Sequence, residues 1–168
     1  MPSIRRLDRP NADDLLDAVN RRLLRELEQD GRLSTAELAR RVNLSPPAVA
    51  ERVRRLEQAG VITGYRAVID PRAVGYPLSA MVRIRPAPRQ LPKVAEIAAA
   101  VPEVVECHRI TGDDCFLLTL RLRSMDDLEP ILDRFVLYGQ TTTSIVQSSP
   151  VAPRGVPLEA REDGRAAG

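Results

Sequence analysis

The chain has 168 residues, of which 43% are hydrophobic and 29% charged, proportions typical of a globular protein with one generous domain or two small ones. No apolar run approaches the ~20 residues that a membrane-spanning helix needs, and the polar stretch from Met1 to Asn11 lacks the apolar segment of a secretory signal. We therefore expect a cytoplasmic protein. Its net charge of +2 is too small to indicate a nucleic-acid partner by itself.

The positive charge is unevenly distributed along the chain. Between Val19 and Gly75, eleven arginines stand against seven acids, a net charge of +4 in that stretch. This distribution favours a negatively charged partner for the N-terminal part of the chain, although the total charge does not.

Metal and enzymatic chemistry find little support in the sequence. Cys107 and Cys115 are the only cysteines, which is normal for free thiols in a reducing compartment. Because His108 is the only histidine, the usual four-ligand zinc sets cannot be assembled. Cys107 and His108 are neighbours in a predicted strand, so their side chains point to opposite faces and cannot act as nucleophile and base. No Gly-rich phosphate loop follows a strand, and we predict no metal, cofactor or catalytic residue.

Two helices are predicted first. Apolar residues recur at helical spacing behind a potential N-cap at Asp17, which predicts a helix over 18–29. Ser34 and Glu37 then have the spacing of a capping box, in which each side chain satisfies the other residue's amide. A second, shorter helix is expected over about 35–41.

A third helix follows after a short turn. Asn43 tolerates the left-handed backbone that often ends a helix, and Ser45-Pro46 supplies an N-cap followed by a proline in the first turn. Gly60 is placed to end this helix. Two helices joined by a turn of about three residues, behind a supporting helix, form a helix-turn-helix. Beyond it, Val61 to Ile69 is expected to form two short strands broken near Gly64, the wing.

The third helix has the properties of a DNA recognition helix. Val49, Val53 and Leu56 form one inward stripe, so the polar side chains face outward behind small residues at the N-terminal end. Small residues permit close approach to base edges, arginines reach guanine or phosphate, and the hydroxyls and amides at both helix starts can bind phosphates. The candidate DNA-binding residues are Ser34, Thr35, Ser45, Pro46, Pro47, Ala48, Glu51, Arg52, Arg54 and Arg55.

A simpler interpretation of this helix stays open. Arg52, Arg54 and Arg55 are also what a solvated helix face contains, with Glu51 and Glu57 as partners within the helix. Glu51 itself suits either a base-edge contact to cytosine or an ion pair with an arginine, and the sequence does not distinguish them.

The second half of the chain predicts a ferredoxin-like sandwich. Apolar and polar residues alternate from Leu78 to Arg85 with the period of a half-buried strand, and the later segments give the order strand, helix, strand, strand, helix, strand. Pro130 requires the second helix to be kinked or to start late. These elements are expected at 78–85, 91–101, 104–110, 115–122, 124–136 and 141–149.

The sequence thus predicts an α+β protein in four parts. A winged helix-turn-helix domain occupies 12–70, a linker 71–77, a ferredoxin-like βαββαβ domain 78–152, and a flexible tail 153–168.

Ordered motifs in both halves closely resemble the leucine-responsive and asparagine-regulator (Lrp/AsnC) family. The resemblance covers nearly the whole chain. Its main motifs are Asp30-Gly31-Arg32-Leu33-Ser34, Leu44-Ser45-Pro46, Arg52-Val53-Arg54-Arg55-Leu56-Glu57 and Gly60-Val61-Ile62 in the first half, and Glu106-Cys107-His108 and Thr111-Gly112-Asp113 in the second.

This resemblance implies a transcriptional regulator that binds double-stranded DNA. It further implies a homodimer formed by the C-terminal domains, frequently assembled into an octamer-like ring, with amino acids bound where dimers meet. The effector-binding residues it implies are Thr111, Gly112, Asp113, Asp114, Gln140, Thr141, Thr142 and Thr143. Carboxylates suit an ammonium group, and hydroxyls or amides suit a carboxylate.

One position departs from the family pattern. Many members have an acid immediately before the aromatic residue that opens the third strand, whereas Cys115 precedes Phe116 here. This difference leaves three possibilities: another effector, a weakly bound one or none. Without the resemblance, Gly112-Asp113-Asp114 is an ordinary turn sequence.

Three functions remain to be compared. The first is a sequence-specific regulator modulated by an amino acid. The second is a nucleoid-architectural protein that wraps DNA with little sequence preference. The third is a ferredoxin-like small-molecule-binding or enzyme domain whose helical N-terminus makes protein contacts only.

Overall fold

The computed structural model describes residues 15–158, which divide into two compact units. One unit comprises 15–67 and 153–158, and the other comprises 68–152. The segment from Met1 to Asn11, the start of the first predicted domain and residues 159–168 of the predicted tail lie outside the described residues. Between residues 15 and 158, no helix is both long and apolar enough to cross a bilayer.

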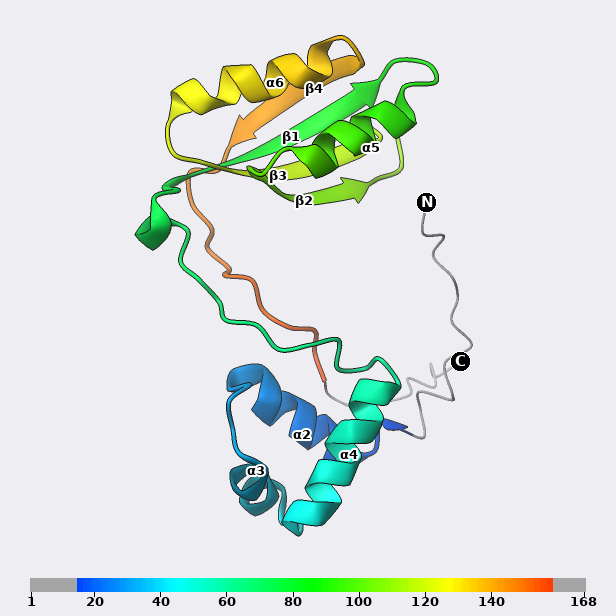
Figure 1. Cartoon of the computed structure of the whole chain (residues 1–168), viewed down its shortest axis with the longest axis vertical. Coiled ribbons are helices and arrows are strands. Elements are labelled where there is room, and N and C mark those ends of the chain that lie inside the picture. The colour runs from blue at the N-terminus through cyan, green and yellow to red at the C-terminus, as the bar shows by residue number, and fades with distance from the viewer. Residues whose placement is uncertain (1–14, 159–168) are drawn as a thin grey trace, which may run out of the picture. The chain divides into compact units, whose positions relative to one another are not determined.

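Three helices form the first unit: α2 (Ala18–Gln29), α3 (Thr35–Val42) and α4 (Pro46–Gln58) (Figure 1). The caps expected from the sequence define where α2 and α3 begin. The Asp17 carboxylate accepts a hydrogen bond of 2.7 Å from the Asn20 amide, and the Ser34 hydroxyl accepts one of 3.2 Å from the Glu37 amide. The helices enclose a small apolar core of Leu23, Leu38, Ala39, Val42 and Val49.

The turn between α3 and α4 is fixed by a left-handed residue. Asn43 has φ 57°, and the Leu44 amide then reaches back to the Ala39 carbonyl at 3.0 Å. At the end of α4, Gly60 has φ 68°, and the Val61 amide donates to the Leu56 carbonyl at 2.9 Å. Both ends are Schellman motifs, so the helix-turn-helix is specified by local backbone chemistry.

The two predicted strands of the wing do not form. Residues 61–69 are extended but pair with no strand within 15–158, and Val68 and Ile69 are 96% and 64% exposed. A strand needs a partner that buries its apolar side chains, and each half of this segment has only three or four residues on either side of Gly64. The expectation of a β-hairpin here is therefore wrong.

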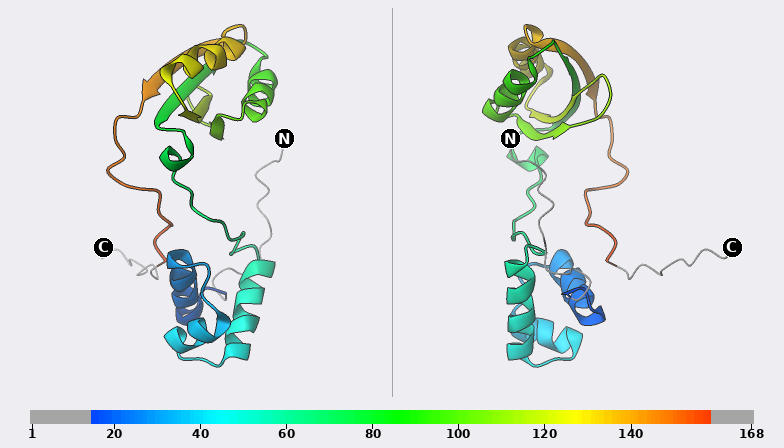
Figure 2. Two further views of the ribbon diagram at one scale, coloured as in Figure 1. Left: turned by 60° about the vertical axis from the view of Figure 1, so that its left-hand side comes forward. Right: turned by 90° about the vertical axis from the view of Figure 1, so that its right-hand side faces the viewer.

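The second unit is a four-stranded antiparallel sheet of β1 (Leu78–Pro86), β2 (Val104–Arg109), β3 (Phe116–Leu122) and β4 (Gly139–Ile145), in the order β2-β3-β1-β4. Helices α5 (Leu91–Ala100) and α6 (Leu128–Val136) cover one face of the sheet (Figures 1 and 2). Short 3₁₀ turns at Arg72–Val74 and Met125–Asp127 precede β1 and α6. This order and pairing confirm the α+β class and the ferredoxin-like βαββαβ arrangement.

Alternation along β1 divides the two faces of the sheet. Ala80, Val82 and Ile84 are fully buried beneath the helices, together with apolar residues of β3, α5 and α6. Met81, Arg83 and Arg85 point the other way and are exposed. We call this second surface the open face. It consists of Met81, Arg83 and Arg85 with their opposite residues Gln140, Thr142 and Ser144 on β4.

Two boundaries differ from expectation for a physical reason. Helix α6 starts at Leu128, which leaves Pro130 in its first turn, where a missing amide costs nothing. Strand β4 runs from Gly139 to Ile145 rather than over 141–149. A Cβ on Gly139 would lie 2.5 Å from the Arg85 carbonyl oxygen, so a glycine is needed where the two backbones approach.

Candidate DNA interface and effector site

The start of α4 presents small, exposed residues. Ser45, Pro46 and Pro47 are exposed and Ala48 is half-buried. Ser45 is the N-cap, but its hydroxyl makes no capping hydrogen bond. Because Pro46 and Pro47 have no amide hydrogen, two of the free amides expected at a helix start are missing. The amide of Ala48 is therefore the one available for a phosphate before the helical ladder begins.

One turn later, Glu51 pairs with both exposed arginines of α4. Its Oε1 accepts from Arg54 Nη2 at 2.7 Å and from Arg55 Nε at 2.8 Å, while its Oε2 accepts from Arg54 Nε at 2.9 Å. The side chains of Arg54 and Arg55 remain 53% and 65% exposed. The two guanidinium groups, Arg54 first, lower the pKa of Glu51 to about 2. Glu51 thus stays ionised at any pH at which the protein would work.

Arg52 is separated from the other arginines of α4. Its Nη1 lies 2.7 Å from Asp17 Oδ2 and 3.0 Å from Asn20 Oδ1, both at the start of α2. Asn20 is itself buried, and its side-chain amide donates to the Leu15 carbonyl at 2.7 Å. The predicted DNA-binding set therefore does not form one surface, because Arg52 ties α4 to α2.

At the start of α3, Ser34 and Thr35 are both exposed. The reciprocal half of the expected capping box is not made among the described residues, since the Glu37 carboxylate pairs with Arg40 and Arg41 instead. Arg41 also contacts Glu26 of α2 at 2.7 Å. These ion pairs lie on α2 and α3 and leave the two hydroxyls accessible.

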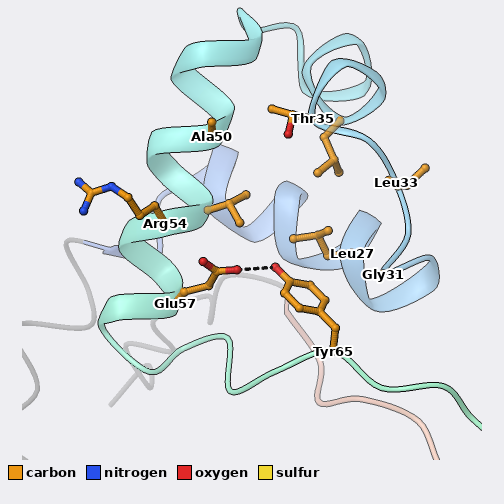
Figure 3. A pocket seen from close by; sticks show the side chains of 10 residues that line it. Leu27, Gly31, Leu33, Thr35, Ala50, Arg54, Glu57 and Tyr65 are labelled. Carbon is orange, nitrogen blue, oxygen red and sulfur yellow. Dashed lines mark hydrogen bonds between the residues drawn. The ribbon is translucent and has the colours of Figure 1, made fainter.

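A groove of about 270 Å³ lies between α2, α3 and α4, with Tyr65 along one side (Figure 3). The Tyr65 hydroxyl donates to Glu57 Oε1 at 3.0 Å, and its ring lies against Gly31. Partial burial, and then the Glu57 carboxylate, raise the pKa of Tyr65. Glu57 is thus the partner of Tyr65 and not of an arginine, and Arg54 extends away from the groove. The sequence analysis did not identify Tyr65, because only tertiary packing brings it to α4.

In the second unit, the loop between β2 and β3 lies beside the arginines of β1. Asp113 Oδ2 is 3.1 Å from Arg85 Nη2, and Asp114 Oδ1 is 3.7 Å from Arg85 Nε. Arg83 Nη1 is 3.9 Å from Asp114 Oδ2. The two acids that the sequence singled out are therefore already paired with cations, which the sequence analysis missed.

The candidate residues of β4 divide between the two faces of the sheet. Gln140 lies opposite Arg85 and Thr142 opposite Arg83 on the open face. Thr141 and Thr143 alternate with them, are half-buried, and lie on the face that carries α6. The structure thus brings Gln140 and Thr142 toward the loop acids through β1, and it separates Thr141 and Thr143 from them.

The remaining loop residues are exposed, as a ligand-contacting loop requires. Thr111 and Gly112 are both exposed, and Gly112 has φ 103°, a conformation that other residues rarely adopt. Cys115 Sγ lies 3.8 Å from the Gly112 carbonyl oxygen and 3.7 Å from that of Asp113. Cys115 thus packs beneath the turn, where an acid would place a charge.

Comparison with known families agrees with both halves of this description. Residues 16–63 match the family described as winged helix-turn-helix DNA-binding, and residues 79–156 match the one described as Lrp/AsnC ligand binding domain.

Individual relatives are similar over most of their length. The chain is 43% identical over 123 residues to the HTH-type transcriptional regulator LrpA of Mycobacterium tuberculosis, covering 73% of this chain and 82% of that protein. It is 33% identical over 133 residues to LrpC of Bacillus subtilis, covering 79% and 92%.

Two similar solved structures contain an amino acid. A feast or famine regulatory protein from M. tuberculosis complexed with L-methionine has a TM-score of 0.77 and 39% identity, covering 84% of this chain and 98% of that one. A transcriptional regulator from Neisseria meningitidis, also in an L-methionine complex, has a TM-score of 0.79 and 28% identity, covering 84% and 96%.

Proposed function

Because this chain belongs to the Lrp/AsnC family of DNA-binding transcriptional regulators, we propose that it is a sequence-specific regulator whose DNA binding responds to an amino acid. The observation that carries the DNA half is the outward face of α4, where small residues at the helix start precede two exposed arginines. We propose double-stranded DNA as its macromolecular partner and the cytoplasm as its location.

The interface we propose has two parts. Arg54 and Arg55 reach guanine or phosphate, while Ser34, Thr35, Ser45 and the Ala48 amide contact phosphates at the two helix starts. Pro46 and Pro47 permit close approach, and Glu51 faces the duplex one turn further on. Arg52 has another role in this proposal, because its guanidinium is engaged by Asp17 and Asn20. It positions α4 on α2.

A salt titration of DNA affinity tests this interface. Replacing Arg54 and Arg55 by glutamine should weaken binding by roughly a hundredfold at moderate salt and make the slope of log K against log salt shallower by about 2, one for each phosphate or base contact. Arg40→Gln is the matched control, because Arg40 is equally exposed but lies on α3. If the double variant binds like the wild type, α4 does not face the duplex.

The effector half of the proposal rests on the second unit. Arg83, Arg85, Asp113, Asp114, Gln140 and Thr142 bring two cations, two anions, an amide and a hydroxyl to one edge of the open face. An amino-acid zwitterion needs both signs of charge, with its ammonium on the acids and its carboxylate on a cation or amide. The methionine in two structurally similar regulators supports this class of ligand. Thr111 and Gly112 complete the loop side of the proposed site.

We also propose that the chain forms a homodimer through its second unit, with further assembly of dimers into a ring. No helix among the described residues covers the open face, which leaves a whole side of the sheet available. A nucleoid-architectural function is distinguished from a regulatory one by comparing affinity for the chain's own upstream region with affinity for random duplex of equal length. Equal affinities favour the architectural function.

A further inference from the structure

The feature that leads beyond the proposed function is the single carboxylate shared by both exposed arginines of α4. Glu51 accepts from Arg54 through both of its oxygens, at 2.7 and 2.9 Å, and from Arg55 at 2.8 Å. Two parallel hydrogen bonds from one guanidinium match the geometry by which arginine binds phosphate or guanine. In free protein, the groups that would bind DNA are therefore already occupied.

The position of Glu51 sets what happens when α4 meets a duplex. Ala48, Glu51 and Arg55 follow one another at i, i+3 and i+7 and share a face of the helix. The small residues at the helix start let that face approach base edges. Glu51 is thus carried into the groove with the arginines, where phosphates surround its negative charge.

Exchange of partners is easy in this environment, but it leaves a charge behind. The three side chains are between 42% and 65% exposed, and ion pairs in water are weak, so phosphates can compete for the arginines. The freed carboxylate then faces DNA without a hydrogen-bond donor. Only a base edge with an amino group, N4 of cytosine or N6 of adenine, supplies one in the major groove.

We propose that Glu51 is a specificity-determining residue: it withholds Arg54 and Arg55 from DNA of arbitrary sequence and releases them at a site that offers an exocyclic amino group to its carboxylate. This inference rests on the proposed function, because it requires α4 to face the duplex. It also joins the two roles between which the sequence could not decide, since the ion pair holds in the free protein and the base contact in the complex.

The test uses the full chain and two duplexes of equal length: one selected by the wild type from a randomised pool, and a scrambled version of it. Glu51→Gln should bind the scrambled duplex about tenfold more tightly than the wild type, with a salt slope steeper by about 1 to 2, because each arginine set free adds a phosphate contact. The ratio of affinities for selected and scrambled duplex should fall about tenfold or more.

A charge-matched control separates this effect from a simple gain of positive charge. Glu28→Gln changes the net charge equally in the same unit, and Glu28 is exposed on α2 with no ion pair recorded among residues 15–158. It should leave the affinity ratio and the slope near the wild-type values. In a chain that already carries Arg54→Gln and Arg55→Gln, adding Glu51→Gln should change scrambled-duplex affinity no more than Glu28→Gln does.

Glu51→Ala guards against a folding artefact, since alanine favours the helix. It should show the same gain on the scrambled duplex, and a renewed selection should lose the preference at one base pair. Circular dichroism confirms that each variant is folded. A wild type that selects no sequence overturns the proposed regulator itself. A wild type that does select, with Glu51→Gln keeping its ratio and slope, overturns only the role of Glu51.

Discussion

Asn43 decides the angle at which the chain enters α4. It is one of two non-glycine residues with positive φ among the described residues, and its backbone lets the Leu44 amide reach the Ala39 carbonyl. Its side chain is exposed, so its value lies in the backbone conformation it tolerates and not in packing.

Substitution at this position should separate these two contributions. Asn43→Ala should lower the free energy of unfolding by about 1 kcal/mol, because a Cβ disfavours the left-handed region. Asn43→Gly should be neutral within a few tenths of a kcal/mol or slightly stabilising. Urea denaturation followed by circular dichroism measures both. Equal losses in the two variants would show that the amide side chain, and not the backbone, matters at this turn.

Between elements, the contact of Arg52 with the start of α2 is the polar link that positions the recognition helix. Partial burial acts to raise the pKa of Asp17, but the hydrogen bonds from the Asn20 amide and from Arg52 outweigh it, and the pKa is lowered from 3.8. Since the folded-state pKa is the lower one, the stabilisation is present above pH 3.8 and is lost as the pH falls through the folded value.

Arg52→Gln should therefore weaken the fold while leaving phosphate contacts intact. We expect a loss of about 1 kcal/mol at neutral pH, since the pair is partly exposed, and a smaller fall in stability between pH 5 and pH 3 than in the wild type. The salt slope of DNA binding should stay at the wild-type value. Arg40→Gln, whose exposed partner is Glu37, should cost only a few tenths of a kcal/mol. A salt slope that becomes shallower by about 1 in Arg52→Gln would return this residue to the DNA interface.

Elements with local signals were predictable from the sequence, and those that depend on distant partners were not. Asp17, Ser34 and Asn43 fix helix ends through bonds to residues within four positions, and α2 has the predicted bounds. The wing failed because its pairing required a partner strand, and β4 moved because its start depends on the close approach of Gly139 to β1.

The same distinction explains the candidate sites. Alternation along β1 places Arg83 and Arg85 outward, but only the sheet order shows that they lie beside Asp113 and Asp114. Similarly, the helical wheel placed Arg52 at the edge of the outward face, and only the position of α2 shows that it has a partner there.

For the whole molecule, the important feature is that each unit has its own core. The cluster around Leu23 and Val49 and the cluster around Leu118 and Phe135 have no residue in common. A ligand bound to the sheet should therefore raise the unfolding temperature of the second unit in particular. This gives the effector a readout that does not involve DNA.

A thermal-shift screen against the common amino acids tests this expectation. A ligand at a hundred times its Kd should stabilise the folded second unit by about 2.7 kcal/mol, and Asp113→Ala should abolish most of the shift because the ammonium loses its nearest carboxylate. Asp133→Ala is the control, since Asp133 is an exposed acid on α6 of the same unit. A shift of equal size in Asp113→Ala would remove this loop from the proposed effector site.

The central place of β1 in the sheet has a consequence for biosynthesis. β1 is the first strand to leave the ribosome, yet one of its two neighbours, β4, is the last. Until Gly139–Ile145 emerges, the nascent sheet has an uncovered edge along Ala80–Pro86, and its amides and carbonyls await a partner. Chains translated next to one another on the same messenger are thus exposed to mispairing at this edge, and the timing of β4 synthesis determines how long that exposure lasts.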